Sequence, residues 1–206
     1  WVRAFRSATG FSLLAKGLLA MASVTIQVGI DEYAAVSDRD HKAEDAQLAL
    51  HTTDMTGCVS LVVTTQSCAF LTHAQPFMEV GAPGTAEQHK QALELALRTF
   101  LNFAEEKVQR VVIVTSGSSR TLEEMKVFAQ KTLCQLDTVK EGFRGVQVRD
   151  RKASGRSQDD TDWEILPTHE RMPEAPASRD IQNMWRWAAS PPLLMTGTLS
   201  PDAGAD

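Results

Sequence analysis

The sequence predicts an α/β (α+β) protein with a central mixed β-sheet or sandwich and flanking helices. Short β-prone runs recur along the chain, and two longer apolar patterns have helical spacing. The second half of the chain orders them as helix, apolar strand, helix, strand. With 206 residues and 43% hydrophobic content, the chain can bury one core and has the size of a single domain.

The first strand expected covers residues 23–30, where apolar and polar residues alternate with period two. An acidic, loop-like stretch follows it. Two β-prone runs, at 58–65 and 68–73, are separated by Gln66-Ser67, which predicts a hairpin that ends before Pro76.

Two helices are expected next. The first begins with a capping-box pattern, Thr85 and Gln88, and should run to about Lys107. The second follows the same pattern at Thr121 and Glu124. The apolar run at 110–115 lies between them and predicts a strand covered on both faces. Two shorter strands, at 145–149 and 163–166, complete the predicted domain.

Both termini differ in composition from this domain, which we place at 23–166. Residues 1–22 are basic, with no acidic residue before Asp31, and Lys16 interrupts their apolar run. Three interpretations stay open for this segment: a secretory signal, an organelle presequence or an amphipathic lead-in helix. Residues 167–206 are rich in Pro, Ala, Ser and Gly, so we expect a partly disordered tail in which Trp185 and Trp187 provide a docking element.

Composition excludes several classes of function. The net charge of −5 and the absence of a dense basic stripe argue against a nucleic-acid partner. No apolar run approaches the ~20 residues that span a bilayer. The chain has three cysteines, an odd number, and they are not spaced like the ligands of a metal ion. We therefore expect no structural metal and no cofactor. Reduced thiols favour a reducing, cytoplasmic working environment, with export or organelle targeting left open.

The predicted hairpin brings two reactive side chains to one face. A two-residue turn at Gln66-Ser67 would place Ser60 opposite His73, and Cys58 opposite Gln75. Cys58 and His73 would then be diagonal neighbours, roughly 7–8 Å apart between α-carbons. Cys68 would lie on the opposite face. A three-residue turn would reverse this parity.

A thiol beside an imidazole can carry out covalent catalysis. The imidazole takes the thiol proton, the sulfur attacks a carbonyl, and the proton returns to the leaving amine. Gly57 precedes Cys58 and would allow a tight turn in which a backbone N–H faces the developing oxyanion. A buried cysteine on a strand is more often inert packing, so these residue types alone do not establish catalysis.

Motifs around the hairpin add a resemblance. The run TTDMTGC at 52–58, followed by an apolar strand and FLTH at 70–73, resembles the active-site hairpin of the CheD-like deamidases. That superfamily includes the chemoreceptor glutamine deamidases and the catalytic domain of cytotoxic necrotizing factor. The protein N-terminal asparagine amidohydrolases have a similar hairpin. The resemblance covers about residues 50–150, and this chain has Met-Thr-Gly-Cys where those families have Leu-Ser-Gly-Cys or Gly-Ser-Cys.

The resemblance implies a role for each matched residue. Cys58 would be the nucleophile, His73 the general base and acid, and Thr52 the residue that orients the imidazole. Thr53 or Thr56 is an alternative in that third role. Thr56 and Gly57 form the motif before the nucleophile.

The predicted function is therefore hydrolysis of a side-chain carboxamide, glutamine rather than asparagine, on a protein substrate. A transglutaminase-like variant, in which an amine replaces water, stays open. The alternative from another class is a catalytically inactive interaction module of the same fold.

Two other features are assigned to surface structure. The loop at 115–120 is interpreted as an ordinary strand-to-helix connection, and His41, His51, His89 and His169 as solvated, although His51 could line the site.

Overall fold

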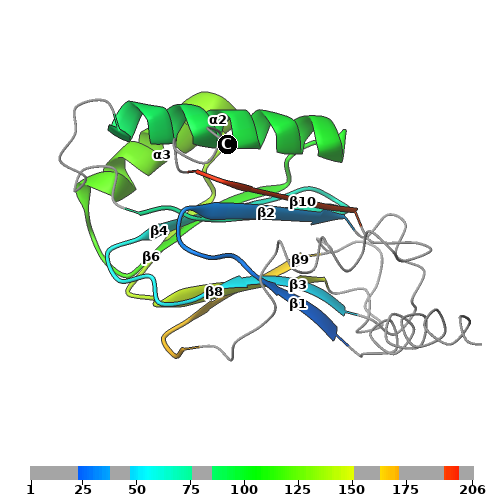
Figure 1. Cartoon of the computed structure of the whole chain (residues 1–206), viewed down its shortest axis with the longest axis horizontal. Coiled ribbons are helices and arrows are strands. Elements are labelled where there is room, and N and C mark those ends of the chain that lie inside the picture. Colours follow the sequence, from blue (N-terminus) through cyan, green and yellow to red (C-terminus); the bar gives the residue numbers. More distant parts are fainter. Residues whose placement is uncertain (1–22, 38–46, 76–84, 151–162, 172–192, 200–206) are drawn as a thin grey trace, which may run out of the picture.

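The computed structural model describes residues 23–37, 47–75, 85–150, 163–171 and 193–199. These residues form three layers: two helices, a six-stranded sheet and a four-stranded sheet (Figure 1). One apolar core lies between the helices and the six-stranded sheet, and a second lies between the two sheets. This arrangement confirms the predicted mixed α+β class.

The six-stranded sheet has the spatial order β10-β2-β5-β4-β6-β7. Adjacent strands are antiparallel except β6 and β7, which are parallel. The strands are β2 (Glu32–Ser37), β4 (Val59–Thr64), β5 (Cys68–His73), β6 (Arg110–Thr115), β7 (Thr138–Glu141) and β10 (Leu193–Thr198). Its central strands β4, β5 and β6 are buried on both faces because a core covers each side.

The four-stranded sheet has the order β1-β3-β8-β9. Its strands are β1 (Ser23–Gln27), β3 (Gln47–Thr52), β8 (Gly145–Asp150) and β9 (Trp163–Thr168). β1 and β3 are parallel, whereas the other two pairs are antiparallel. Leu48 and Leu50 of β3 point toward the six-stranded sheet and contribute to the core between the sheets. Thr52 has the same parity, so its side chain faces that sheet too.

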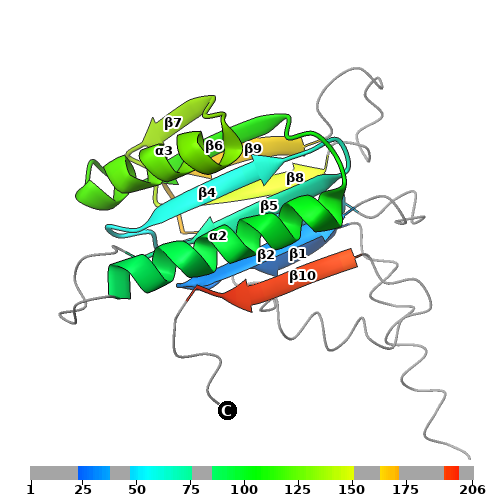
Figure 2. The same cartoon turned by 90° about the horizontal axis from the view of Figure 1, so that it is seen from above.

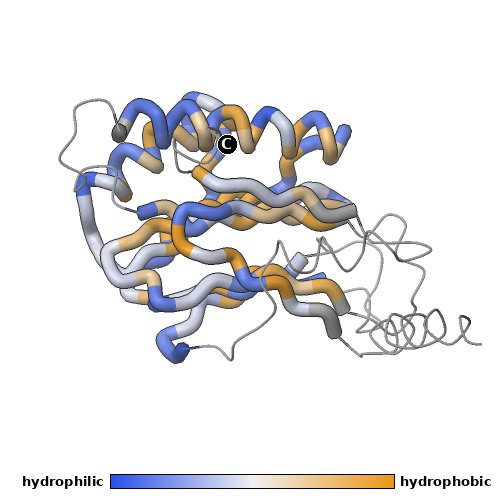
Figure 3. Tube along the Cα trace, viewed as in Figure 1, coloured by the Kyte–Doolittle hydropathy of each residue, from blue (hydrophilic) through white to orange (hydrophobic). Residues whose placement is uncertain are grey.

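The two helices, α2 (Thr85–Ala104) and α3 (Arg120–Leu133), cover the outer face of the six-stranded sheet (Figure 2). Each turns an apolar stripe toward the sheet and a hydrophilic surface outward (Figure 3). α2 ends at Ala104, not at Lys107, because Glu105 adopts the left-handed conformation with φ 51°. No helix in the described ranges is long and apolar enough to cross a membrane.

The start of α3 differs from the sequence prediction. Thr121 was expected to cap the helix, but the N-cap is Ser119, whose side chain accepts a hydrogen bond from the Leu122 amide at 3.2 Å. Thr121 is instead buried in the first turn. The cap therefore begins two residues earlier than the capping-box pattern indicated.

The acidic stretch after the first strand is not a simple loop. β1 ends at Gln27 rather than at Ile30, and the chain turns through Asp31, which has φ 56°. Along the chain, β2 precedes residues 38–46 and β3 follows them. Their short apolar runs are strands because each is covered by neighbouring strands in the folded sheet. His41, which was predicted to be solvated, lies outside the described residues.

The C-terminal boundary also differs from the prediction. β9 continues through Pro167 to Thr168, and residues 193–198 form β10 at the edge of the six-stranded sheet. The tail predicted for 167–206 thus includes parts of both sheets. Leu199 is buried in the core beneath α2, and its amide donates a hydrogen bond to the Asp31 carbonyl at 2.6 Å. Residues 1–22, Trp185 and Trp187 lie outside the described residues.

Candidate active site

The β4–β5 hairpin has the register that the sequence predicted. Val62 pairs with Leu71 and Val63 with Phe70, and an isolated bridge joins Val59 to Ala74. The same register places Cys58 one position beyond this bridge, opposite Gln75. Residues 66 and 67 form the turn, so the parity assumed for Cys58 and His73 is correct.

Packing shows which face each cysteine occupies. Cys58 belongs to the core between the two sheets, together with Leu71, whereas Cys68 belongs to the core beneath the helices. His73 is two residues from Leu71 on β5 and therefore points to the same face as Cys58. Cys58 is 6% exposed, so the thiol lies at the margin of this core.

The imidazole of His73 is held by a residue from the other sheet. Thr52 Oγ1, at the end of β3, lies 2.6 Å from His73 Nδ1, and both side chains are buried. His73 Nε2 is also buried and has no hydrogen-bond partner within the described residues. If Nδ1 carries the hydrogen and donates it to Thr52 Oγ1, then Nε2 is the ring atom that can accept a proton.

A close approach of two backbones allows Thr52 to reach this position. A β-carbon on Gly145 would lie 2.6 Å from the Thr52 carbonyl oxygen and 3.3 Å from Thr53 Cα. A side chain at residue 145 would therefore push β8 away from the end of β3. Glycine at position 145 thus allows Thr52 to lie within hydrogen-bond distance of His73.

The thiol is oriented toward its own loop. Cys58 Sγ donates to the Thr56 carbonyl at 3.7 Å, a long contact that is typical of a weak sulfur hydrogen bond. No hydrogen bond joins Sγ to His73 Nε2 in the described part of the chain. Proton transfer from Cys58 to His73 therefore requires the thiol to turn away from Thr56.

Burial keeps both reactive groups neutral. It lowers the pKa of His73 to about 4, although the negative charges of Asp31 and Asp54 oppose this shift. Burial, assisted by the charge of Asp31, raises the pKa of Cys58 to about 11. The shift of Cys58 is opposite to the depressed pKa of a cysteine that is activated as a thiolate before substrate binds. At neutral pH the site contains a thiol and an uncharged imidazole.

The alternatives for the third site residue occupy different environments. Thr53 Oγ1 is buried and has no hydrogen-bond partner among the described residues, whereas Thr56 is exposed. Only Thr52, of the three threonines considered, is hydrogen-bonded to His73 in this structure. Gly57 has φ 76°, a conformation that favours glycine, and its amide donates to Ser116 Oγ at 2.9 Å.

Two residues near the site were not identified from sequence. The Asp31 amide donates to the His73 carbonyl at 2.7 Å, and its carboxylate accepts a hydrogen bond from the Gln75 amide at 3.0 Å. Ser116 follows β6 and contacts Gly57. The strand-to-helix loop that contains Ser116 was noticed in the sequence, but its proximity to Cys58 depends on the pairing of β4 with β6.

His51 does not line the site and is not solvated. It is 3% exposed, and burial lowers its pKa. Because it neighbours Thr52 along β3, its side chain points to the opposite face of the four-stranded sheet. Within the described residues, no group of three or more His, Cys, Asp or Glu side chains is arranged to hold a metal ion.

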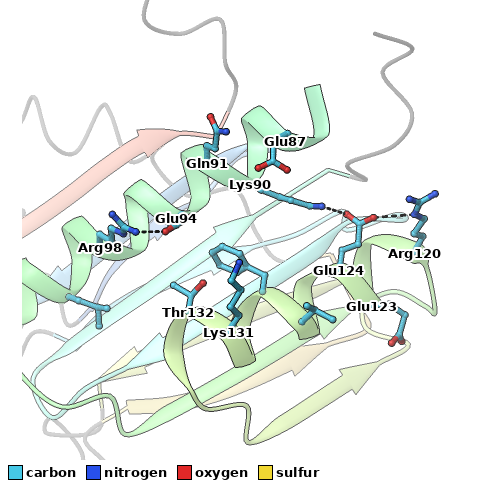
Figure 4. A pocket seen from close by; sticks show the side chains of 13 residues that line it. Glu87, Lys90, Gln91, Glu94, Arg98, Arg120, Glu123, Glu124, Lys131 and Thr132 are labelled. Atoms are coloured by element: carbon cyan, nitrogen blue, oxygen red, sulfur yellow. Dashed lines mark hydrogen bonds and ion pairs between the residues drawn. The ribbon is translucent and has the colours of Figure 1, made fainter. Parts of the chain in front are cut away.

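A separate groove of about 790 Å³ lies between α2 and α3, on the other side of the six-stranded sheet (Figure 4). Lys90 of α2 reaches Glu124 of α3 across it at 3.0 Å, and Arg120 binds the same carboxylate at 3.1 Å from the preceding turn of α3. Burial raises the pKa of Glu124, but the two cations outweigh it and the pKa is lowered. Acidic and basic side chains are mixed along the groove. It contains neither Cys58 nor His73.

No protein-family model matches the chain, and no curated protein matches its sequence.

Proposed function

We propose that this protein is a cysteine-dependent amide hydrolase that deamidates glutamine side chains, and less readily asparagine side chains, on a protein substrate. The observation that carries the proposal is the 2.6 Å contact between Thr52 Oγ1 and His73 Nδ1. It fixes the imidazole from the neighbouring sheet and leaves Nε2 without a partner, on the face that also carries Cys58. A base held through one ring nitrogen and open at the other is the arrangement that nucleophilic catalysis needs.

The chemistry uses these atoms in a defined order. His73 Nε2 removes the thiol proton as Cys58 Sγ attacks the carboxamide carbon, giving a tetrahedral intermediate. The protonated imidazole then returns the proton to the leaving nitrogen, and ammonia departs from a thioester. Water attacks the thioester with His73 again as the base. The products are a side-chain carboxylate and ammonium, and the Cys58 thiol is restored.

The neutral resting state determines how the first step proceeds. A pKa of about 11 for Cys58 and about 4 for His73 means that the proton stays on sulfur until the substrate is bound. Deprotonation therefore accompanies attack, as it does for a serine nucleophile, instead of preceding it. Activity should extend well below pH 6.5 because His73 stays unprotonated there.

Chain order supports the assignment to a CheD-like fold. The hairpin that carries Cys58 and His73 is followed by α2, β6 and α3, which is the order that the resemblance implies. Both sheets contribute to the site, since Thr52 comes from β3. A reducing, cytoplasmic environment is part of the proposal because a thiol nucleophile must stay reduced.

The test is ammonia release from a casein digest, and from a peptide pool containing internal and N-terminal Gln and Asn. Wild type should release ammonia, and both Cys58→Ser and His73→Ala should lose at least about 100-fold in rate. Cys68→Ser, on the other face of the hairpin, is the matched control and should retain the wild-type rate. Mass spectrometry of the products separates deamidation from a transglutaminase-like outcome when an amine is added.

The second candidate is a catalytically inactive interaction module of the same fold. The burial of Cys58, its raised pKa and its contact with Thr56 favour this alternative. Iodoacetamide labelling of the folded protein in the presence of the peptide pool separates the two. Substrate-dependent protection of Cys58 together with ammonia release supports the enzyme, whereas an inert Cys58 and no ammonia from any peptide would establish the module.

A further inference from the structure

Ser116 lies next to the segment that carries the proposed nucleophile. The β4–β6 ladder ends with Val59 paired to Thr115. Cys58 immediately precedes β4 and Ser116 immediately follows β6, and Ser116 Oγ accepts a hydrogen bond from the Gly57 amide, so this hydroxyl lies beside the segment that leads into Cys58. Cys58 is thus flanked by β5, which carries His73, and by the end of β6, which carries Ser116.

The end of β6 anchors the chain on both sides of Cys58. The Gly57 amide donates to Ser116 Oγ at 2.9 Å, and Thr115 Oγ1 donates to the Cys58 carbonyl at 3.1 Å. These contacts bind the peptide groups before and after the nucleophile. The strand-to-helix connection at 115–120 therefore contacts the segment that carries Cys58.

The hydroxyl of Ser116 retains an unused hydrogen. A serine hydroxyl has one hydrogen to donate and two lone pairs that accept. Ser116 Oγ accepts from Gly57, and none of the described residues accepts the Ser116 hydrogen. The side chain is half-buried, so a bound substrate can reach it. The Gly57 N–H polarises the hydroxyl and strengthens it as a donor.

We propose that the Ser116 hydroxyl donates its hydrogen bond to the oxyanion formed when Cys58 attacks the carboxamide. This inference rests on the proposed amide hydrolase function. It also changes the role expected for Gly57, whose N–H acts through Ser116 instead of facing the oxyanion. The hydrogen stays on Ser116 throughout, so the donor stabilises charge and exchanges no proton with the substrate.

The test compares Ser116→Ala with Ser116→Thr, which keeps the hydroxyl, and with Ser118→Ala, an exposed serine of the same loop. Ammonia release from the casein digest and iodoacetamide alkylation of Cys58 are measured for each. Ser116→Ala should lower kcat by about 100-fold with little change in KM, because the donor acts on the transition state. Alkylation forms no oxyanion, so its rate should stay within about twofold of wild type. Ser116→Thr and Ser118→Ala should keep most of the activity.

The outcomes separate this inference from the function on which it rests. Ammonia release by wild type that is unchanged in Ser116→Ala would refute the role of Ser116 and leave the hydrolase intact. Parallel loss of ammonia release and alkylation would show that Ser116 only positions the Cys58 loop, which also overturns the inference. A wild-type protein that releases no ammonia, with an inert Cys58, would overturn both.

Discussion

At the residue scale, the orientation and the pKa of His73 depend on groups from separate parts of the chain. Thr52 holds its ring at Nδ1, and the Asp31 amide binds its carbonyl. The charges of Asp31 and Asp54 raise the pKa of His73, but burial has the larger and opposite effect. The imidazole is therefore fixed in orientation and kept neutral, which are the two properties of a general base at neutral pH.

Replacing Thr52 with valine tests the first property. Thr52→Val keeps the side-chain shape but removes the partner of Nδ1, so the free energy of unfolding should fall by about 1–3 kcal/mol. The rate of ammonia release should fall at least about tenfold because the imidazole loses its orientation. Urea denaturation and the ammonia assay measure these effects. Thr52→Ser keeps the hydroxyl and should retain the wild-type stability and rate of ammonia release. Wild-type activity in Thr52→Val would exclude Thr52 from the site.

The neutrality of His73 predicts a pH-dependent stability. Its pKa is 6.5 in the unfolded chain and about 4 in the folded protein, so the unfolded state binds the proton more tightly. The free energy of unfolding should fall as the pH drops from about 6.5 to 4, and His73 should account for about 3 kcal/mol of that loss. Urea denaturation at pH 7, 5.5 and 4 measures it.

The matched variant for this pH effect is His73→Gln, which cannot titrate. Its stability should depend less steeply on pH over the same interval. Burial also lowers the pKa of His51, which gives a contribution of the same sign that both proteins retain. Parallel stability curves for wild type and His73→Gln would show that His73 is not buried in its neutral form.

At the scale of elements, the hairpin register determines whether Cys58 and His73 share a face. Glu106, just beyond α2, fixes the turn. Its carboxylate accepts hydrogen bonds from Thr65 Oγ1 at 2.6 Å, from the Ser67 amide at 2.9 Å and from Ser67 Oγ at 2.8 Å. A residue far from the site in sequence thus sets the parity on which the site depends, since a one-residue slip would reverse every side chain.

Glu106→Gln should lower the free energy of unfolding by about 1–3 kcal/mol because charge-assisted bonds to a partly buried turn are lost. Glu105→Gln removes the same charge from the adjacent, exposed position and should change stability by no more than about 0.5 kcal/mol. Urea denaturation of the two variants makes the comparison. Equal effects would mean that net charge, not the turn, is responsible.

At the scale of the whole molecule, the last described strand, β10, completes the six-stranded sheet by pairing with β2, which lies near the N-terminal end of the described chain. β10 pairs with β2, and Leu199 fills the core beneath the helices. The Leu199 amide also binds the carbonyl of Asp31, whose own amide binds His73. The strand pairing connects the end of the described chain to the backbone that supports the site.

Leu199→Ala should therefore destabilise the whole domain, by about 2–5 kcal/mol, because it leaves a cavity in a closed core. Thr198→Ala, at the exposed preceding position, should change stability by no more than about 0.5 kcal/mol. Thermal or urea unfolding followed by circular dichroism measures both variants. A small effect of Leu199→Ala would indicate that β10 is peripheral to the fold.

The sequence predicted those elements that depend on interactions between residues close together in the chain, and it did not predict those that depend on distant residues. The hairpin from Cys58 to His73 was predicted with its register, because a two-residue turn and period-two alternation are local properties. The helices and β6 were predicted for the same reason. β2, β3, β7 and β10 were not predicted, since each is a short run that becomes a strand by pairing with strands that are distant along the chain.

The amino-acid sequence by itself determined the hairpin, its parity and the residue types that suggest a cysteine hydrolase. Tertiary structure alone decided that Thr52 meets His73, that Ser116 binds the Gly57 amide next to Cys58, and that the thiol and imidazole are neutral. These features depend on the packing of one sheet against the other and on the order of strands within a sheet. Neither property leaves a local pattern in the sequence, because both arise from contacts between residues that are distant along the chain.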